Sequence, residues 1–135
     1  MAKSAKEKLN QTKAPKRVVL EKDFAGIRAG QRMLVGTPQM VDAYIREIPS
    51  GETRTIHRLR NELARREKCD ATCPVSTAIF VRISAEAAIE DMDAGRPEST
   101  VTPFWRIISA DDKVAAKLPI DPEWITRQRA LEAAS

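Results

Sequence analysis

Apolar residues recur at helical spacing after Thr37-Pro38, which predicts an amphipathic helix in this part of the chain. A threonine at the N-cap and a proline at the first helical position are typical of a helix start. Pro49 and Gly51 end the pattern. The apolar face consists of Met40, Val41, Tyr44, Ile45 and Ile48.

A second helix is predicted to begin after Thr55, the next plausible N-cap. Its apolar face consists of Ile56, Leu59, Leu63 and Ala64, and its basic residues are Arg54, Arg58, Arg65, Arg66 and Lys68. A helix with an apolar inner face and a basic outer face can lie on a phosphate backbone. The alternative is an ordinary solvated surface, because charge patterns without a motif are common.

The segment from Val75 to Ser84 is apolar almost all round and rich in β-branched residues. Propensity alone would allow a strand here. Cys73-Pro74 at the start and the alanines that follow favour one long buried helix ending near Gly95. Its far end is acidic, so a DNA partner should approach the N-terminal end, where the helix dipole is positive.

Shorter patterns complete the prediction. Two apolar runs around Gly26 and Gly30 predict an extended arm or a short β-hairpin over residues 18–36. Trp105 to Ile108 is predicted as a short strand. A last helix should begin at Asp121-Pro122, with Trp124, Ile125 and Leu131 facing inward.

The chain of 135 residues is long enough for one domain with a core. The predicted fold class is α+β, mostly α, with a basic flexible tail over 1–17, the arm or hairpin over 18–36, and the main domain over 37–135. The formal charge is +4, and six basic residues against Glu7 alone lie in 1–17. Such a tail either attracts an anionic partner, nucleic acid first, or merely aids solubility. No apolar run has membrane-spanning length, so no membrane partner and a cytoplasmic location are expected.

The two cysteines, Cys69 and Cys73, are expected to be free thiols in a reducing cytosol. A structural zinc site needs four ligands, and His57 is the only histidine. No metal and no other cofactor are therefore expected.

Four motifs occur in a recognisable order over residues 38–134. They are Ile48-Pro49-Ser50-Gly51-Glu52-Thr53, Cys73-Pro74-Val75-Ser76-Thr77-Ala78, Pro103-Phe104-Trp105-Arg106-Ile107 and Leu131-Glu132. Together they resemble the DNA-binding domain of the methylated-DNA–protein-cysteine methyltransferase family, and a poorly characterised bacterial branch of it. The resemblance implies a winged-helix-like C-terminal alkyltransferase domain, with the second motif opening the DNA-recognition helix.

The reactive positions of that family are replaced in this chain. On this alignment Phe104 stands where the family has its alkyl-accepting cysteine, and Trp105 where it has the activating histidine. Cys73 replaces the arginine inserted into the base stack, and Ile56 replaces the tyrosine that helps to extrude the nucleotide. Without a nucleophile at the usual site, alkyl transfer is not expected, and no catalytic residue is predicted.

The resemblance implies a non-catalytic protein that binds double-stranded DNA and senses alkylated or damaged bases. It would act as a monomer, with a downstream repair protein as a further partner. The expected DNA contacts are Arg54, Thr55, Arg58, Thr72, Cys73, Ser76, Thr77 and Arg106. The expected base pocket consists of Pro103, Phe104, Trp105 and Glu132, with the aromatic rings as its floor and wall.

Two alternatives stay open. Phe104 and Trp105 could simply pack the core, and the fold could serve as a protein-interaction module or an unrelated enzyme. In the second case, Cys73 at a helix N-terminus is a candidate reactive thiol, although a small buried residue is the commoner role of a free cysteine. A positive, concave surface around the N-terminal end of the helix from Pro74 would favour DNA, and a neutral or acidic one would favour the alternatives.

Overall fold

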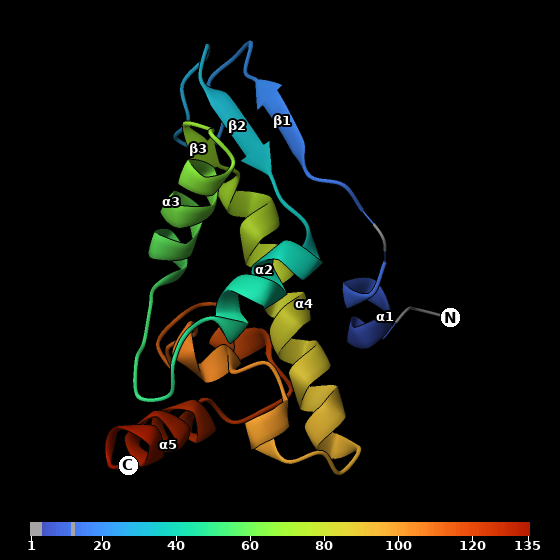
Figure 1. Ribbon diagram of the computed structural model, residues 1–135, viewed down its shortest axis with the longest axis vertical. Coiled ribbons are helices and arrows are strands. Elements are labelled where there is room, and N and C mark those ends of the chain that lie inside the picture. Colours follow the sequence, from blue (N-terminus) through green and yellow to red (C-terminus); the bar gives the residue numbers. More distant parts are fainter. Residues whose placement is uncertain (1–3, 12) are drawn as a thin grey trace.

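The long helix α4, Pro74–Asp93, runs from a small sheet at one end of the molecule to the C-terminal elements at the other (Figure 1). The computed structural model describes residues 4–11 and 13–135. It confirms a mostly helical α+β fold. The remaining elements are α1 Ala5–Leu9, β1 Lys16–Val19, β2 Arg32–Val35, α2 Pro38–Arg46, α3 Ile56–Arg66, β3 Ala71–Thr72, the 3-10 helices η1 Glu98–Thr100, η2 Phe104–Arg106 and η3 Ala115–Lys117, and α5 Pro122–Ala133. No helix among the described residues is long and apolar enough to cross a membrane.

The sheet has the strand order β1-β2-β3. β1 and β2 pair antiparallel with Lys16 opposite Val35, so the hairpin begins at Lys16, within the predicted tail. Gly30 adopts φ 88°, a left-handed conformation, where its amide donates to the Leu20 carbonyl at 2.7 Å. β3 pairs parallel with β2 and links α3 to α4. Among the described residues, no strand follows β3.

The predicted helix starts are confirmed by their caps. The Thr37 hydroxyl accepts from the Met40 amide at 3.1 Å, and the Thr55 hydroxyl accepts from the Arg58 amide at 3.0 Å. Pro74 opens α4, and Gly95 follows its end with φ 101°. The first turns of α2, α3 and α4 therefore follow directly from the local sequence.

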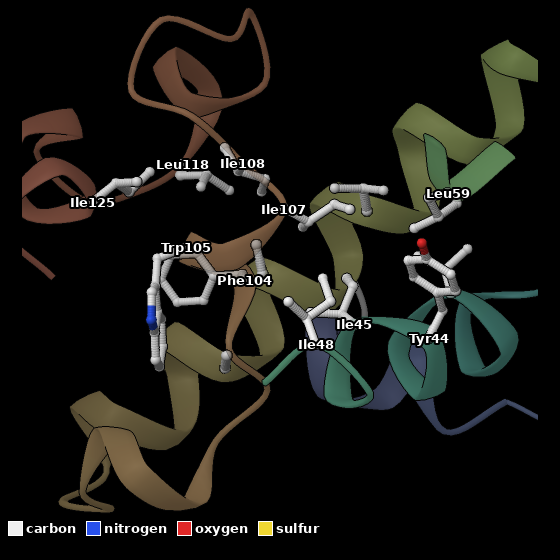
Figure 2. Close-up of a cluster of buried hydrophobic side chains, with 14 of the residues drawn as sticks. Tyr44, Ile45, Ile48, Leu59, Phe104, Trp105, Ile107, Ile108, Leu118 and Ile125 are labelled. Carbon is white, nitrogen blue, oxygen red and sulfur yellow. The ribbon is translucent and has the colours of Figure 1, made fainter. Parts of the chain in front are cut away.

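One core joins α2, α3, α4, η2 and α5 (Figure 2). Its largest fully buried side chains include Tyr44 from α2, Leu59 from α3, Val81 from α4 and Trp105 from η2. A second, smaller cluster of Ile27, Met33 and Cys73 lies under the hairpin.

Two predictions about the C-terminal part are wrong. Residues 104–106 form the 3-10 helix η2, whereas a strand was predicted from Trp105. The Arg106 amide donates to the Pro103 carbonyl at 3.0 Å and the Ile107 amide to the Phe104 carbonyl at 3.1 Å, which is the bonding pattern of a 3-10 helix. Leu131 was expected inside, but it lies on the outer face of α5 and is 64% exposed.

The predicted flexible tail is also partly ordered. Residues 1–3 and 12 lie outside the described part, but Ala5–Leu9 form α1. Backbone amides of Ala5 and Lys6 donate to the Glu90 carboxylate at 2.8 and 3.1 Å, and the Lys6 ammonium pairs with Asp91 at 2.8 Å. The acidic end of α4 therefore holds the basic start of the chain in place, a long-range pairing that local composition does not reveal.

Candidate nucleic-acid interface

Arg54 and Arg58, the first two predicted DNA contacts, belong to a charged cluster between α2 and α3. The guanidinium of Arg54 lies 5.5 Å from the Tyr44 ring centroid, and that of Arg66 lies 5.2 Å from it. The Tyr44 hydroxyl donates to Glu62, which also pairs with Arg58 at 3.1 Å. Burial, reinforced by Glu62, raises the pKa of Tyr44 above its ordinary value. Arg54 and Arg58 are thus already paired with carboxylates of the protein, Glu52 and Glu62.

The predicted contacts at the junction of α3 and α4 act on the backbone. Thr55 caps α3. The Thr72 hydroxyl donates to the Arg60 carbonyl at 2.8 Å, and the Thr77 hydroxyl donates to the Cys73 carbonyl at 2.6 Å. Thr72, Cys73 and Thr77 are buried. Thr72, Cys73 and Thr77 therefore position the two helices from inside the protein, whereas Thr55 is exposed at the start of α3.

Arg106, the last predicted DNA contact, is held by three groups. Its Nη2 lies 2.6 Å from Oε2 of Glu132 on α5, and its Nη1 donates to the Ile48 carbonyl at 2.7 Å. The guanidinium also lies 5.6 Å from the Trp105 ring centroid. Burial alone would raise the pKa of Glu132, but hydrogen bonds and charge from Arg106 lower it below its ordinary value. Arg106 therefore links η2 to α5 and to the segment that follows α2.

A cavity of about 480 Å³ adjoins this ion pair. Its volume lies in the usual range of small-molecule pockets. Three of the four predicted pocket residues line it, namely Pro103, Trp105 and Glu132, whereas Phe104 does not. The other lining residues are Arg46, Ser50, Glu98, Ser99, Val101, Arg106 and Gln128.

The aromatic rings beside the cavity pack against one another. Phe104 is fully buried and stacks on Trp124, with 5.5 Å between ring centroids and 15° between planes. Trp105 is 2% exposed and meets both rings edge-on, at 5.4 and 5.6 Å. Its indole Nε1 is buried and makes no hydrogen bond of ordinary geometry within the described residues, although it helps Arg106 to lower the pKa of Glu132. In this conformation neither ring presents an open face on which a base could stack.

The exposed face of α4 carries apolar side chains that local sequence reasoning had assigned to the core. Val75 is 54% exposed and Ile79 is 53% exposed, and Ala78 and Arg82 are exposed beside them. We call these four residues the α4 face. They recur at helical spacing and so form one continuous stripe along the N-terminal half of α4. Ser76 lies off this stripe, and its hydroxyl is buried.

Lysines from two distant parts of the chain flank the α4 face; we call Lys8, Lys113 and Lys117 the basic rim. Lys113 and Lys117 share a hollow of about 250 Å³ with Ala78, Ile79 and Arg82. Lys8 shares another, of about 450 Å³, with Ile79, Arg82, Ile83 and Glu86. Arg82 pairs with Glu86 at 3.4 Å, while the rim lysines form no ion pair within residues 4–11 and 13–135.

Sequence reasoning missed this surface for identifiable reasons. Val75 to Ser84 is apolar nearly all round, so the pattern does not reveal which side is exposed. Lys113 and Lys117 follow a turn without a recognised motif, and Lys8 fell in the predicted tail. The available signal was the dipole argument, which had already singled out the N-terminal end of the helix.

Comparisons of this chain with protein-family models, with curated proteins and with solved structures find no match.

Proposed function

We propose that this chain is a non-catalytic DNA-binding module of the winged-helix type that contacts duplex DNA through the α4 face. The observation that carries the proposal is an exposed apolar stripe, Val75 to Arg82, flanked by the basic rim. In this proposal α3 and α4 are the helix pair, and the β1–β2 hairpin takes the place of the wing. The hairpin precedes the helix pair here, whereas a wing normally follows it.

Apolar side chains beside unpaired cations suit a DNA groove. Lysines neutralise phosphates and release counterions, which supplies most of the sequence-independent affinity. Small and branched apolar side chains make van der Waals contacts with the groove, and minor-groove binders use them as wedges. The α4 dipole adds positive potential at its N-terminal end. The acidic residues Glu90 and Asp91 lie at the far end, where α1 binds them.

Alkyl transfer is not part of the proposal. Neither Cys69 nor Cys73 lines the cavity beside Trp105, and the family's acceptor position is the buried Phe104. The sensing of a damaged base is a narrower proposal that depends on this cavity. It requires a base to enter beside the Arg106–Glu132 pair without stacking on the covered ring of Trp105.

Fluorescence anisotropy with a labelled plain duplex and an alkylguanine-containing duplex tests both parts. Reversing charge in Lys113→Glu/Lys117→Glu should weaken binding to both duplexes at least tenfold. Arg127→Glu, which reverses one charge on α5, is the control and should leave affinity nearly unchanged, whereas Lys117→Glu alone, its single-charge match on the basic rim, should weaken binding.

Equal losses in the rim variant and the control would overturn the proposed face. Equal affinity of the wild-type protein for the two duplexes would overturn lesion sensing and leave plain DNA binding intact. Intact mass after incubation with the alkylated duplex should stay unchanged, and a stoichiometric gain on Cys69 or Cys73 would revive an enzymatic function.

A further inference from the structure

β1 is the outer strand of the sheet, and its outer edge is open. All four of its residues are exposed, and Val19 is 64% exposed. Figure 1 shows β2 on one side of β1 and no element alongside the other. An uncovered edge offers backbone donors and acceptors to another strand.

The register identifies the backbone groups that point outward. The Leu20 amide donates to the Gln31 carbonyl, so Leu20 faces β2. Antiparallel strands alternate in this respect, so Val18 and Lys16 also face β2. Arg17 and Val19 therefore direct their amides and carbonyls to the open edge. Within the described chain those four groups have no hydrogen-bond partner.

An apolar groove runs beside the same edge. It measures about 560 Å³ and is lined by residues 18–24 together with Met33. Val18 and Phe24 contribute large apolar side chains that are 41% and 43% exposed. Exposed valine and phenylalanine next to unpaired backbone are typical of a surface that another strand covers.

We propose that β1 pairs antiparallel with β1 of a second copy of this chain, joining the two sheets across a two-fold axis. Three antiparallel registers with a two-fold axis would pair the outward-facing amides and carbonyls of Arg17 and Val19. Centring on Arg17 places two arginines directly opposite each other, which is unfavourable, and brings in Pro15, which lacks an amide hydrogen. Centring on Val19 requires Glu21, which lies beyond the end of β1.

Centring on Val18 uses only residues of β1. Arg17 of each copy then bonds to Val19 of the other, and the two Val18 residues meet on the axis. No like charges lie directly opposite each other. Lys13 and Lys16 come alongside the segment of the second copy that holds Glu21, Lys22 and Asp23, while Arg17 stays paired with Glu67 of its own chain. This charge arrangement favours a second copy, and it replaces the expectation of a monomer.

Sedimentation equilibrium without DNA tests the dimer. The wild-type chain should show the mass of two chains. Val19→Lys should be monomeric, because it places a charge in the pairing edge. Leu131→Lys makes the same change at a residue on α5 that is also 64% exposed, and it should remain dimeric. A monomeric wild-type chain would overturn the proposal. This holds even if the open edge then proves to bind an extended peptide of another protein.

A cysteine scan tests the register. Opposite residues in a non-hydrogen-bonded pair lie about 4.5 Å apart between Cα atoms, within the range that a disulfide spans. Under mild oxidation Val18→Cys should form a covalent dimer, whereas Lys16→Cys and Leu131→Cys should react no faster than the wild-type protein with its two native thiols. Equal rates for Val18→Cys and Leu131→Cys would overturn the register. Because neither assay contains DNA, its outcome is independent of the proposed function.

Discussion

Arg106 shows how one side chain can fix a local structure. Its guanidinium bonds to the Glu132 carboxylate and the Ile48 carbonyl, and its own carbonyl accepts from the Arg54 amide at 2.8 Å. A planar group with five donors can satisfy such partners together, which a lysine cannot do. The segment that the family resemblance singled out is thus held in place by an arginine whose guanidinium bonds to groups of the protein itself.

Trp105→Ala should lower the free energy of unfolding by about 3–5 kcal/mol, because it empties a buried aromatic site between Phe104 and Trp124. Urea denaturation measures this loss, and Leu131→Ala on the exposed side of α5 should change it by less than about 0.5 kcal/mol. If the folded variant also keeps its ratio of alkylated-to-plain duplex affinity, Trp105 has no role in a base pocket.

Glu132→Gln should destabilise the protein by about 1–3 kcal/mol at neutral pH, since it weakens charge-assisted hydrogen bonds to Arg106. The folded state lowers the pKa of Glu132 from its ordinary value of 4.5. Its stabilising contribution is therefore complete above that value and is lost as the pH falls through the lower, folded-state pKa. Urea midpoints of the two proteins measured from pH 7 to pH 3 should converge at the acid end, and a constant difference would contradict this origin.

The family resemblance singled out the stretch 103–106 and Glu132, and three of the four pocket residues that it implies do line one cavity. The sequence did not reveal which carboxylates pair with the predicted arginines. Arg54 pairs with Glu52 and Glu62, and Arg58 also pairs with Glu62. Arg106 pairs with Glu132. Whether an arginine is free depends on which carboxylate the fold brings to it, and for Arg106 that partner lies 26 residues away.

Among the elements, helices with strong local signals were predicted well and short elements were not. Thr37, Thr55 and Asp121 cap the helices that they were expected to cap. η2 was mistaken for a strand because four apolar residues in five positions suit either structure when both faces are buried. α1 was missed because its five residues are stable only through their tertiary contact with α4.

Glu90→Ala should therefore release α1. The variant loses the acceptor for the Ala5 and Lys6 amides, and we expect a cost of about 1–2 kcal/mol in the free energy of unfolding. Hydrogen exchange at the amides of Ala5 to Leu9 should accelerate selectively. Glu86→Ala on the same helix removes only a surface pair with Arg82 and should cost less than about 0.5 kcal/mol. Similar effects of the two variants would mean that α1 does not depend on Glu90.

At the scale of the whole molecule, the ion pairs of the fold determine which basic side chains remain unpaired, and the composition alone does not. The basic start of the chain is partly neutralised on α4, through Lys6 and Asp91, and on α3, where Arg17 pairs with Glu67 at 2.5 Å. The cations that remain beside the α4 face come from α1, α4 and the segment around η3. A net charge of +4 alone could not locate this surface.

The salt dependence of DNA affinity should report these cations. If Lys8, Lys113 and Lys117 each neutralise one phosphate, the logarithm of affinity should fall with the logarithm of salt concentration with a slope of roughly −3. Lys113→Ala/Lys117→Ala should flatten the slope by roughly two units, as measured by anisotropy titrations at several salt concentrations. An unchanged slope would remove the two lysines from the interface.

The contact between α1 and α4 also has a consequence for the order of events during synthesis. The hydrogen bond from the Ala5 amide to Glu90 joins residues 85 positions apart. At elongation rates of roughly 5–20 residues per second, the first helix of the chain waits roughly 4–17 seconds before its binding site on α4 has been made. During that interval α1 lacks the carboxylate that accepts its first amides. α1 is thus made well before its binding site and docks only after α4 has been synthesised.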